Sequence, residues 1–188
     1  MTPTDTVPEV GVSVWSLDPA HSAVHFKVRH MAIAWVRSDF RISKGTFEWN
    51  EDKIEESYIE VEIDPASVIS TEPKRDEHLR NADFFDVERF PSIHFRSTKI
   101  SKASADTALV AGELTIRGVT RPVELDVTEI SPATEDPSGN ICFGASAATK
   151  INREDFGLTW NKTLETGGLL VGDDVYIDLD VEFIRQAD

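Results

Sequence analysis

The sequence has very little cysteine. Cys142 is the only one among 188 residues, so no disulfide can form within the chain. It lies in a run of small residues and not among basic ones. We therefore expect a buried, unreactive thiol and not a nucleophile.

Basic residues are also scarce. The chain has 19 lysines and arginines against 34 aspartates and glutamates, which gives a formal net charge of −15. That charge repels nucleic-acid phosphates and anionic lipid surfaces. We expect no nucleic acid partner, and no peripheral membrane docking as the main activity. The acidity favours solubility.

Long apolar runs are missing. No stretch approaches the roughly 20 apolar residues that cross a bilayer, so the sequence predicts no stable membrane insertion. Residues 1–11 have neither the basic region nor the apolar core of a secretory signal, which favours a cytoplasmic protein. They contain two prolines and little to bury, so we expect a flexible tail before a single domain at residues 12–188.

Motifs for catalysis and for phosphate binding are absent. The chain contains no Gly-x-Ser-x-Gly, and Gly167-Gly168 is not followed by Lys-Ser/Thr. Asp18, His21 and Ser22 are the residue types of a hydrolytic triad, but their spacing is typical of a turn. The sequence therefore predicts no catalytic residue and no cofactor.

The histidines do not form a metal-binding pattern. His25 points outward from an alternating strand, while His21 and His30 lie in the turns at its opposite ends. Separated by the length of a strand, those two cannot share one ion. His78 or His94 could complete a site only through the fold. We predict no metal site.

What the sequence does have is alternation, most clearly at residues 108–128. Leu114 and Ile116 alternate with polar residues, and Val123 and Leu125 do so after a turn, which predicts an antiparallel hairpin with one apolar face. With residues 118–121 as the loop, Ile116 faces Val123 and Leu114 faces Leu125.

Further segments complete an all-β pattern. We expect strands at residues 12–17, 22–29, 40–49 (with a β-bulge at Gly45), 59–63, 92–100, 141–150 and 175–183. Residues 30–36 are apolar without alternation and suggest a short helical or irregular crossing, and the strand pattern breaks at Asp64-Pro65. A short surface helix is expected at residues 72–81, and a single turn at 152–157.

Strands of this number, joined by hairpins, predict a β-sandwich or a closed antiparallel barrel. A barrel of about eight strands has room for side chains alone or for one small ligand. The strand at residues 141–150 is small on both faces, with Ala145 and Ala147 on one of them. This favours a hollow interior, although small residues also allow close packing of two sheets.

Four motifs in order resemble the YceI-like polyisoprenoid-binding family. They are WSLDPAHSAVHF (15–26), RDEHLRNADFFDVERFPSIHF (75–95), GELTIRGVTRPVEL (112–125) and INREDFGLTW (151–160). The resemblance implies an all-β fold, a lipocalin-like elongated antiparallel β-barrel with short helices near its ends. It also implies a long apolar tunnel for a polyisoprenoid, a quinone tail or a fatty-acid-like chain. Ser38 stands where the family more usually has glycine.

We predict the residues of such a tunnel from the apolar faces of the strands and from two consecutive phenylalanines that close one end. The apolar wall comprises Val24, Phe26, Val28, Phe47, Trp49, Phe84, Phe85, Leu114, Ile116, Val123, Leu125, Ile177 and Leu179. For the polar end we name Arg75, His78, Asn152 and Arg153. An apolar face that packs on itself would give the same pattern.

The sequence therefore favours a non-enzymatic carrier or reservoir whose partner is a long-chain isoprenoid or related lipid. One alternative is a lipid-modifying enzyme with His21 or His78 as its base. Another is an interaction module whose barrel is filled by its own side chains. A homodimer through an exposed outer strand face stays open.

Overall fold

The computed structural model describes residues 11–102 and 104–187, so the expected tail lies outside the described residues except for Gly11. The described chain consists mainly of β-strands. They are β1 (Val12–Leu17), β2 (Ala23–His30), β3 (Ala34–Asn50), β4 (Tyr58–Ile69), β5 (Ile93–Lys102), β6 (Ala108–Ile116), β7 (Val119–Thr128), β8 (Thr134–Glu135), β9 (Ile141–Asn152) and β10 (Val171–Arg185). One α-helix, α1 (Pro73–Arg80), and two 3₁₀ helices, η1 (Ile54–Glu56) and η2 (Arg153–Phe156), complete it.

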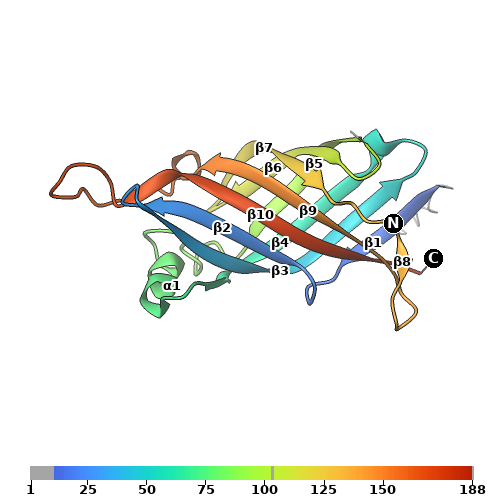
Figure 1. Cartoon of the computed structure of the whole chain (residues 1–188), viewed down its shortest axis with the longest axis horizontal. Helices are drawn as coiled ribbons and strands as arrows, with labels where there is room; N and C mark the ends of the chain where they lie inside the picture. The colour runs from blue at the N-terminus through green and yellow to red at the C-terminus, as the bar shows by residue number, and fades with distance from the viewer. Residues whose placement is uncertain (1–10, 103, 188) are drawn as a thin grey trace, which may run out of the picture.

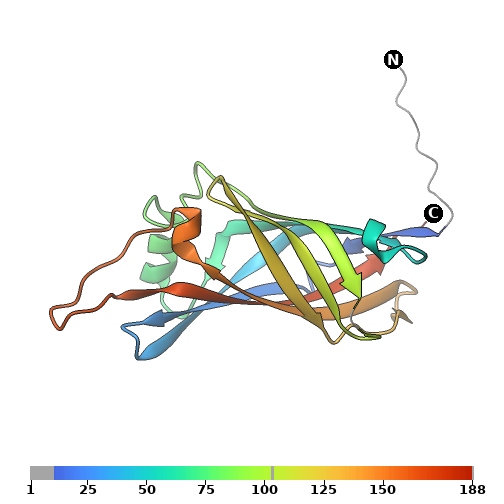
Figure 2. The same ribbon diagram turned by 90° about the horizontal axis from the view of Figure 1, so that it is seen from above.

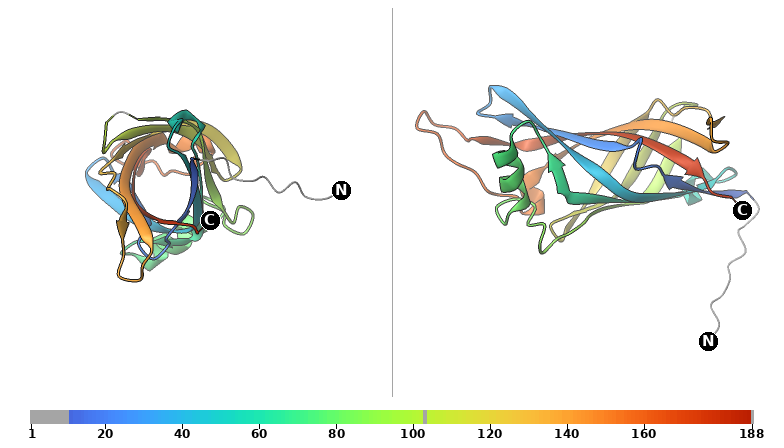
Figure 3. Two further views of the ribbon diagram at one scale, coloured as in Figure 1. Left: turned by 90° about the vertical axis from the view of Figure 1, so that its right-hand side faces the viewer. Right: turned by 90° about the horizontal axis from the view of Figure 1, so that it is seen from below.

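Eight antiparallel strands close into a barrel, as predicted. Following the hydrogen-bonded neighbours, β2, β3, β4, β5, β6, β7, β9 and β10 form a ring, because β10 pairs with both β9 and β2. The ring is visible end-on in the left view of Figure 3. Closure removes the free strand edges that would otherwise pair with other chains.

β1 and β2 share one place in this ring. β2 pairs with the first part of β3 and with the start of β10. β1 pairs with the last part of β3, at Val12–Ser16 against Thr46–Asn50, and with the end of β10. The two strands therefore follow one another along the barrel, separated by the turn at residues 18–22.

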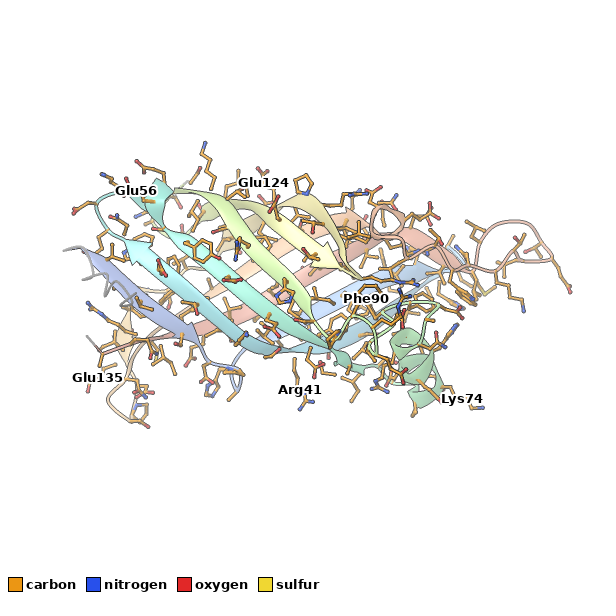
Figure 4. The ribbon with its side chains drawn as sticks, turned by 180° about the vertical axis from the view of Figure 1, so that it is seen from behind. Arg41, Glu56, Lys74, Phe90, Glu124 and Glu135 are labelled. Carbon is orange, nitrogen blue, oxygen red and sulfur yellow. The ribbon has the colours of Figure 1, made fainter. Side chains whose placement is uncertain are left out.

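The barrel is elongated (Figures 1 and 2). β3 has 17 residues and β10 has 15, and at about 3.3 Å per residue each runs for roughly 50 Å. α1 lies at one end, which we call the α1 end. The opposite end, with residues 50–58, 104–108 and 128–141, is the termini end (Figure 1). Figure 4 shows Lys74 at the α1 end and Glu56 and Glu135 at the other.

The helix prediction is confirmed. α1 begins with Pro73 at its first position, where a proline costs no hydrogen bond, and the side chain of Glu72 accepts a hydrogen bond from the Lys74 amide. η2 is capped in the same way by Asn152 and ends at Gly157, whose φ of 75° is left-handed. Both helices lie at the α1 end (Figure 2).

The predicted bulge exists, two residues earlier than expected. The register between β3 and β4 shifts between Ile42 and Lys44, which places the irregularity at Ser43 and not at Gly45. Gly45 has a different role: a Cβ there would lie 2.9 Å from the Cβ of Leu17. Glycine at this position therefore lets β1 pack closely on β3.

The expectation for residues 30–36 is wrong. A tight turn at residues 31–33 joins β2 to β3, and Met31 and Ala32 adopt left-handed φ angles of 53° and 59°. The expectation of a helical or irregular crossing rested on the bulk of these residues and on the lack of turn-forming residues among them. Ile33 is instead 75% exposed, so its hydrophobicity does not reflect core packing.

The expectation that the strand breaks at Asp64-Pro65 is also wrong. β4 continues to Ile69 through a wide irregularity, since Arg41 pairs with Asp64 and Asp39 pairs with Ile69. The Ser67 hydroxyl bridges the two strands at this irregularity. It accepts a hydrogen bond from the Arg41 amide at 2.8 Å and donates one to the Asp64 carbonyl at 2.6 Å.

The central hairpin forms with a different register. Its turn is the pair Arg117-Gly118, with φ angles of 51° and 73°, so Ile116 faces Val119 and Leu114 faces Arg121. Two left-handed residues make the turn that matches strand twist, which favours this short connection over the predicted four-residue loop. Pro122 lies at the fourth position of β7. In the described residues, this part of β7 pairs with β6 on one side and with no strand on the other.

Candidate functional site: an apolar tunnel

The barrel is hollow. A cavity of about 740 Å³ extends along its interior and is lined from all eight strands of the ring. Its volume lies within the range of small-molecule sites, which is about 300–1,000 Å³. The interaction-module alternative required a filled barrel, so the cavity contradicts that alternative.

The thirteen residues predicted for the apolar wall all line this tunnel. They are Val24, Phe26 and Val28 of β2, Phe47 and Trp49 of β3, Phe84 and Phe85 after α1, Leu114 and Ile116 of β6, Val123 and Leu125 of β7, and Ile177 and Leu179 of β10. Period-2 alternation identified the eleven strand residues despite the wrong hairpin register, and Phe84 and Phe85 were named as a consecutive aromatic pair. Successive side chains of a strand point to opposite faces, so every second residue faces inward whichever residue lies opposite on the next strand.

β9 explains why the interior is open. The tunnel face of this strand carries Ala145, Ala147 and Thr149, which are small, between Phe143 and Ile151. Cys142, Gly144, Ser146 and Ala148 alternate with them. A wall with methyl-sized side chains does not reach the opposite wall, so these positions leave space for a ligand.

Many tunnel residues were not predicted, although the same signal identifies them. Phe40, Val61, Phe95, Val110 and Phe183 line the tunnel and are buried. Each has the inward parity of its strand. They were not named because an alternating face does not say whether a side chain contacts a cavity or another side chain.

Aromatic rings gather toward the termini end. Phe143 and Phe183 stack with ring centroids 5.4 Å apart, and Trp15 meets the edge of Phe143 at 4.9 Å. Phe47 joins them, 5.8 Å from Phe183. These four side chains come from β1, β3, β9 and β10 and pack across the interior, which narrows it there.

Phe84 and Phe85 lie at the α1 end, each in an aromatic cluster. Phe85 packs edge-on against Phe40, with centroids 5.1 Å apart, and contacts Phe26 at 6.3 Å. Phe84 lies 5.3 Å from Trp160. Both rings line the tunnel at this end, and the prediction that the pair closes it stays a prediction.

The charged residues that line the tunnel differ between its ends. At the α1 end the lining residues with charged or imidazole side chains are all basic: Arg29, His30, Lys74, Arg75, His78 and Arg153. At the termini end the lining includes one acid and one base, Glu51 and Lys102. The α1 end is therefore the one that suits an anionic group.

Two of the four predicted polar residues, Arg75 and His78, line the tunnel and carry N–H groups that can donate hydrogen bonds to a ligand. Arg75 is half-buried, and its guanidinium donates one long hydrogen bond of 3.3 Å to the Ser70 hydroxyl. The His78 ring is held by Asp83, with Nε2 2.8 Å from the carboxylate, and packs against Trp160. Of the described serines, threonines and cysteines, none is hydrogen-bonded to His78.

The other two have structural tasks. Arg153 is 3% exposed, and its guanidinium donates to the carbonyls of Leu158, Trp160, Val171 and Gly172 and to the Asp173 carboxylate. These acceptors use all of its five N–H groups. Asn152 lies outside the tunnel lining, where its side chain caps η2 through the Glu154 amide.

Ser38 places a hydroxyl in the apolar wall of the tunnel. It is 2% exposed, shares the inward face of β3 with Phe40, and lies opposite Phe26. Its Oγ has no hydrogen-bond partner among the described residues. A buried hydroxyl without a partner is costly, which distinguishes Ser38 from the apolar wall around it.

His21 lies outside the tunnel. Its Nδ1 is 2.7 Å from Asp18 Oδ2, and Glu182 is 3.8 Å away. The hydrogen bond to Asp18 raises the pKa of His21, and the same bond lowers the pKa of Asp18. Asp18, His21 and Glu182 are also the one group of possible metal ligands found among residues 11–102 and 104–187. His25 and His30 are not part of it.

Cys142 is half-buried on the outer face of β9, less enclosed than expected. Partial desolvation and the nearby Asp136 carboxylate raise the pKa of its thiol. The protonated thiol is the unreactive form, so the chemistry expected of this residue agrees with its surroundings.

Comparison with known proteins now identifies the architecture. The model of the YceI-like domain matches residues 15–183. The chain belongs to the YceI-like family. Curated relatives include a UPF0312 protein of Pseudomonas putida, 33% identical over 88% of this chain and 82% of its own length. A UPF0312 protein of Azotobacter vinelandii is 36% identical over 73% of this chain and 71% of its own.

Solved YceI-like structures have the same barrel. The Campylobacter jejuni YCEI protein has a TM-score of 0.69 at 29% identity, over 85% of this chain and 90% of that one. Burkholderia cenocepacia BcnA has a TM-score of 0.75 at 22% identity, over 88% and 98%. A polyisoprenoid binding domain from Saccharophagus degradans has a TM-score of 0.64 at 14% identity, over 92% and 98%. The last two likenesses concern the fold.

Helices of the described residues are too short or too polar to cross a bilayer.

Proposed function

We propose that this YceI-like protein is a non-enzymatic carrier or store for a polyisoprenoid or a similar long-chain lipid, such as a quinone tail or a fatty-acid-like chain. The observation that carries the proposal is the continuous tunnel of about 740 Å³ with apolar walls. A hydrocarbon chain that leaves water for such walls gains about 25 cal/mol per Å² of apolar surface. The described polyisoprenoid binding domain with the same fold supports the ligand class.

The proposal includes an orientation. We place the apolar chain along the thirteen wall residues and the polar head of the lipid at the α1 end. Arg75 and His78 are the groups that would meet it, because both line the tunnel and Arg75 makes no ion pair among the described residues. Arg153 and Asn152 are left out of the head-group site, since their side chains already serve the protein.

A blocked tunnel tests the proposal. Ala147→Trp places a large ring on the inward face of β9, whereas Ala148→Trp places the same ring on the exposed outer face. We expect uptake of a fluorescent geranylgeranyl probe to fall by more than about tenfold in Ala147→Trp, a loss of about 1.4 kcal/mol. Ala148→Trp should bind the probe as the unmodified protein does.

Unfolding curves for both variants accompany the binding measurement. A folded Ala147→Trp protein that takes up the probe normally would contradict the carrier proposal, because the ligand would then lie elsewhere. Failure of the unmodified protein to take up any prenyl or fatty-acid probe would contradict it as well.

Compartment and assembly are also proposals. A single cysteine suits a chain that works under reducing conditions, and we propose a cytoplasmic protein on that ground, to be tested by cell fractionation. A homodimer through an outer strand face is open to analytical ultracentrifugation.

A further inference from the structure

Two neighbouring segments project from the α1 end of the barrel. One is the turn between β2 and β3, and the other is the loop at residues 161–170, at the far left of Figure 1. They are joined, because the Met31 amide donates to the Leu170 carbonyl at 2.9 Å and Val171 pairs with His30. The two segments therefore present one common surface.

This surface exposes apolar side chains. Ile33 is 75% exposed, the highest value among the large hydrophobic side chains that the structure describes. Leu169 of the neighbouring loop is 48% exposed and Met31 is 39% exposed. We call Met31, Ile33 and Leu169 the tip surface. Large aliphatic side chains gathered on projecting turns indicate a surface that meets an apolar partner.

The hairpin that carries Met31 and Ile33 is basic, although the whole chain is acidic. Residues 26–38 contain Lys27, Arg29 and Arg37 and no aspartate or glutamate, although the formal net charge of the protein is −15. The neighbouring loop at residues 161–170 contains one base and one acid, Lys162 and Glu165, so the positive charge at this end comes from the hairpin. A basic hairpin with an apolar tip is complementary to anionic lipid head groups above a hydrocarbon layer.

An aromatic pair supports this interpretation. The Arg29 guanidinium lies 4.1 Å from the centroid of the Trp35 ring, and Lys27 Nζ lies 5.5 Å from it. Trp35 also meets Tyr176 edge-on, with ring centroids 5.4 Å apart. Tryptophan and tyrosine beside lysine and arginine are the side chains found at the level of lipid head groups.

The tip surface is continuous with the tunnel. His30, Leu170 and Val171 lie directly beside it in the chain, and all three line the cavity. The basic lining of the tunnel faces the same end. A lipid that leaves a bilayer at the tip surface would therefore meet the tunnel without crossing water.

We propose that the tip surface docks transiently on an anionic lipid bilayer, so that a lipid passes between the bilayer and the tunnel through the α1 end. The second half of this statement rests on the proposed carrier function, and the first half does not. Docking is end-on, which keeps the acidic sides of the barrel away from the membrane. It is reversible, because two short turns bury little apolar area.

Vesicle flotation tests the docking. Vesicles of phosphatidylcholine alone are compared with vesicles that also contain phosphatidylglycerol, at low and at high salt. We expect the unmodified protein to float with the anionic vesicles at low salt and to be released by high salt. Ile33→Asp and Leu169→Asp should each weaken this binding by about tenfold. Arg37→Gln should weaken it by a smaller factor.

Val14→Asp is the matched control, because Val14 is as exposed as Met31 but lies on β1 at the other end of the barrel. It should float as the unmodified protein does. Equal flotation of Ile33→Asp and the unmodified protein would overturn the proposal, as would no flotation with any vesicle. Concentration-dependent self-association that Ile33→Asp abolishes, without flotation, would overturn it in favour of a second copy of this chain.

Probe uptake separates this inference from the carrier function. Ile33→Asp should take up a geranylgeranyl probe added directly to the solution as well as the unmodified protein does, and should acquire it from anionic vesicles about tenfold more slowly. If the unmodified protein floats but takes up no probe, the carrier function fails and the docking stands. If uptake is normal and transfer from vesicles is unaffected by Ile33→Asp, the docking fails alone.

Discussion

Ser38 carries a buried hydroxyl in the tunnel wall that has no hydrogen-bond partner among the described residues. Its hydroxyl is buried without a partner, so Ser38→Ala should raise the free energy of unfolding of lipid-free protein by about 1 kcal/mol. Urea unfolding measures this. Ser22 is the matched control, because its buried Oγ accepts the Glu182 amide at 3.0 Å and Ser22→Ala should lose about 1 kcal/mol. Equal losses in the two variants would contradict the assignment of Ser38.

His21 gives the protein a local pH dependence. Its pKa is raised from the ordinary 6.5 and that of Asp18 is lowered from 3.8, each chiefly by their shared hydrogen bond. A raised histidine pKa contributes stability below its unfolded value and loses it as the pH rises through the folded value. A lowered aspartate pKa contributes stability above its unfolded value and loses it as the pH falls through the folded value.

The pair therefore stabilises the fold most between about pH 4 and pH 6.5. The difference in melting temperature between the unmodified protein and His21→Gln should be largest in that window and should vanish at alkaline pH. NMR titration should place the pKa of His21 above its ordinary value, and Asp18→Asn should return it toward that value. A stability difference that grows with rising pH would be inconsistent with this pairing.

At the scale of elements, close packing of β5 on β6 depends on Gly112. A Cβ at this position would lie 2.5 Å from both the Phe95 ring and the Arg96 carbonyl oxygen, closer than atoms can approach. Gly112→Ala should therefore lower the free energy of unfolding by about 2 kcal/mol or more, measured by urea unfolding.

Gly144 of β9 provides the comparison. The nearest atom to a Cβ there is the Val181 carbonyl oxygen at 3.4 Å, an ordinary contact. Gly144→Ala should stay within about 0.5 kcal/mol of the unmodified protein. If the two alanine variants were equally stable, the close approach at Gly112 would not matter to the fold.

Strands with one polar face could be predicted from the sequence, and their ends could not. Alternation gave the inward face of β2, β6, β7 and β10 because it depends only on parity. The hairpin register depends on turn geometry, and Arg117 gave no signal of a left-handed φ because this conformation is uncommon outside glycine and asparagine. The turn within residues 30–36 could not be predicted, because Met31 and Ala32, which take left-handed φ angles there, are not turn-forming residue types.

Strand parity also explains why only part of the candidate site could be predicted from the sequence. Parity identifies inward residues such as Ile177, but the contents of the barrel depend on facing walls that the sequence does not place together. Arg153 was named for its charge, yet a basic residue can equally hold a loop through backbone carbonyls, as it does here. Ser38 departs from the residue more usual in the family. Its inward direction could not be predicted, because the strand expected at residues 40–49 begins at Ala34 in the structure.

At the scale of the whole molecule, eight strands enclose a cavity instead of packing their side chains against one another. Small residues on β9 keep the walls apart, and basic residues gather at one end of the cavity. The proposed carrier function uses this enclosed apolar space to keep a water-insoluble chain out of water.

The most direct measurement is the mass spectrum of an organic extract of the protein, purified without detergent and without delipidation. The account predicts one long apolar chain for each protein molecule, lost from the Ala147→Trp variant and retained by Ala148→Trp. An extract with no apolar molecule in stoichiometric amount, from protein that also takes up no prenyl probe, would contradict it.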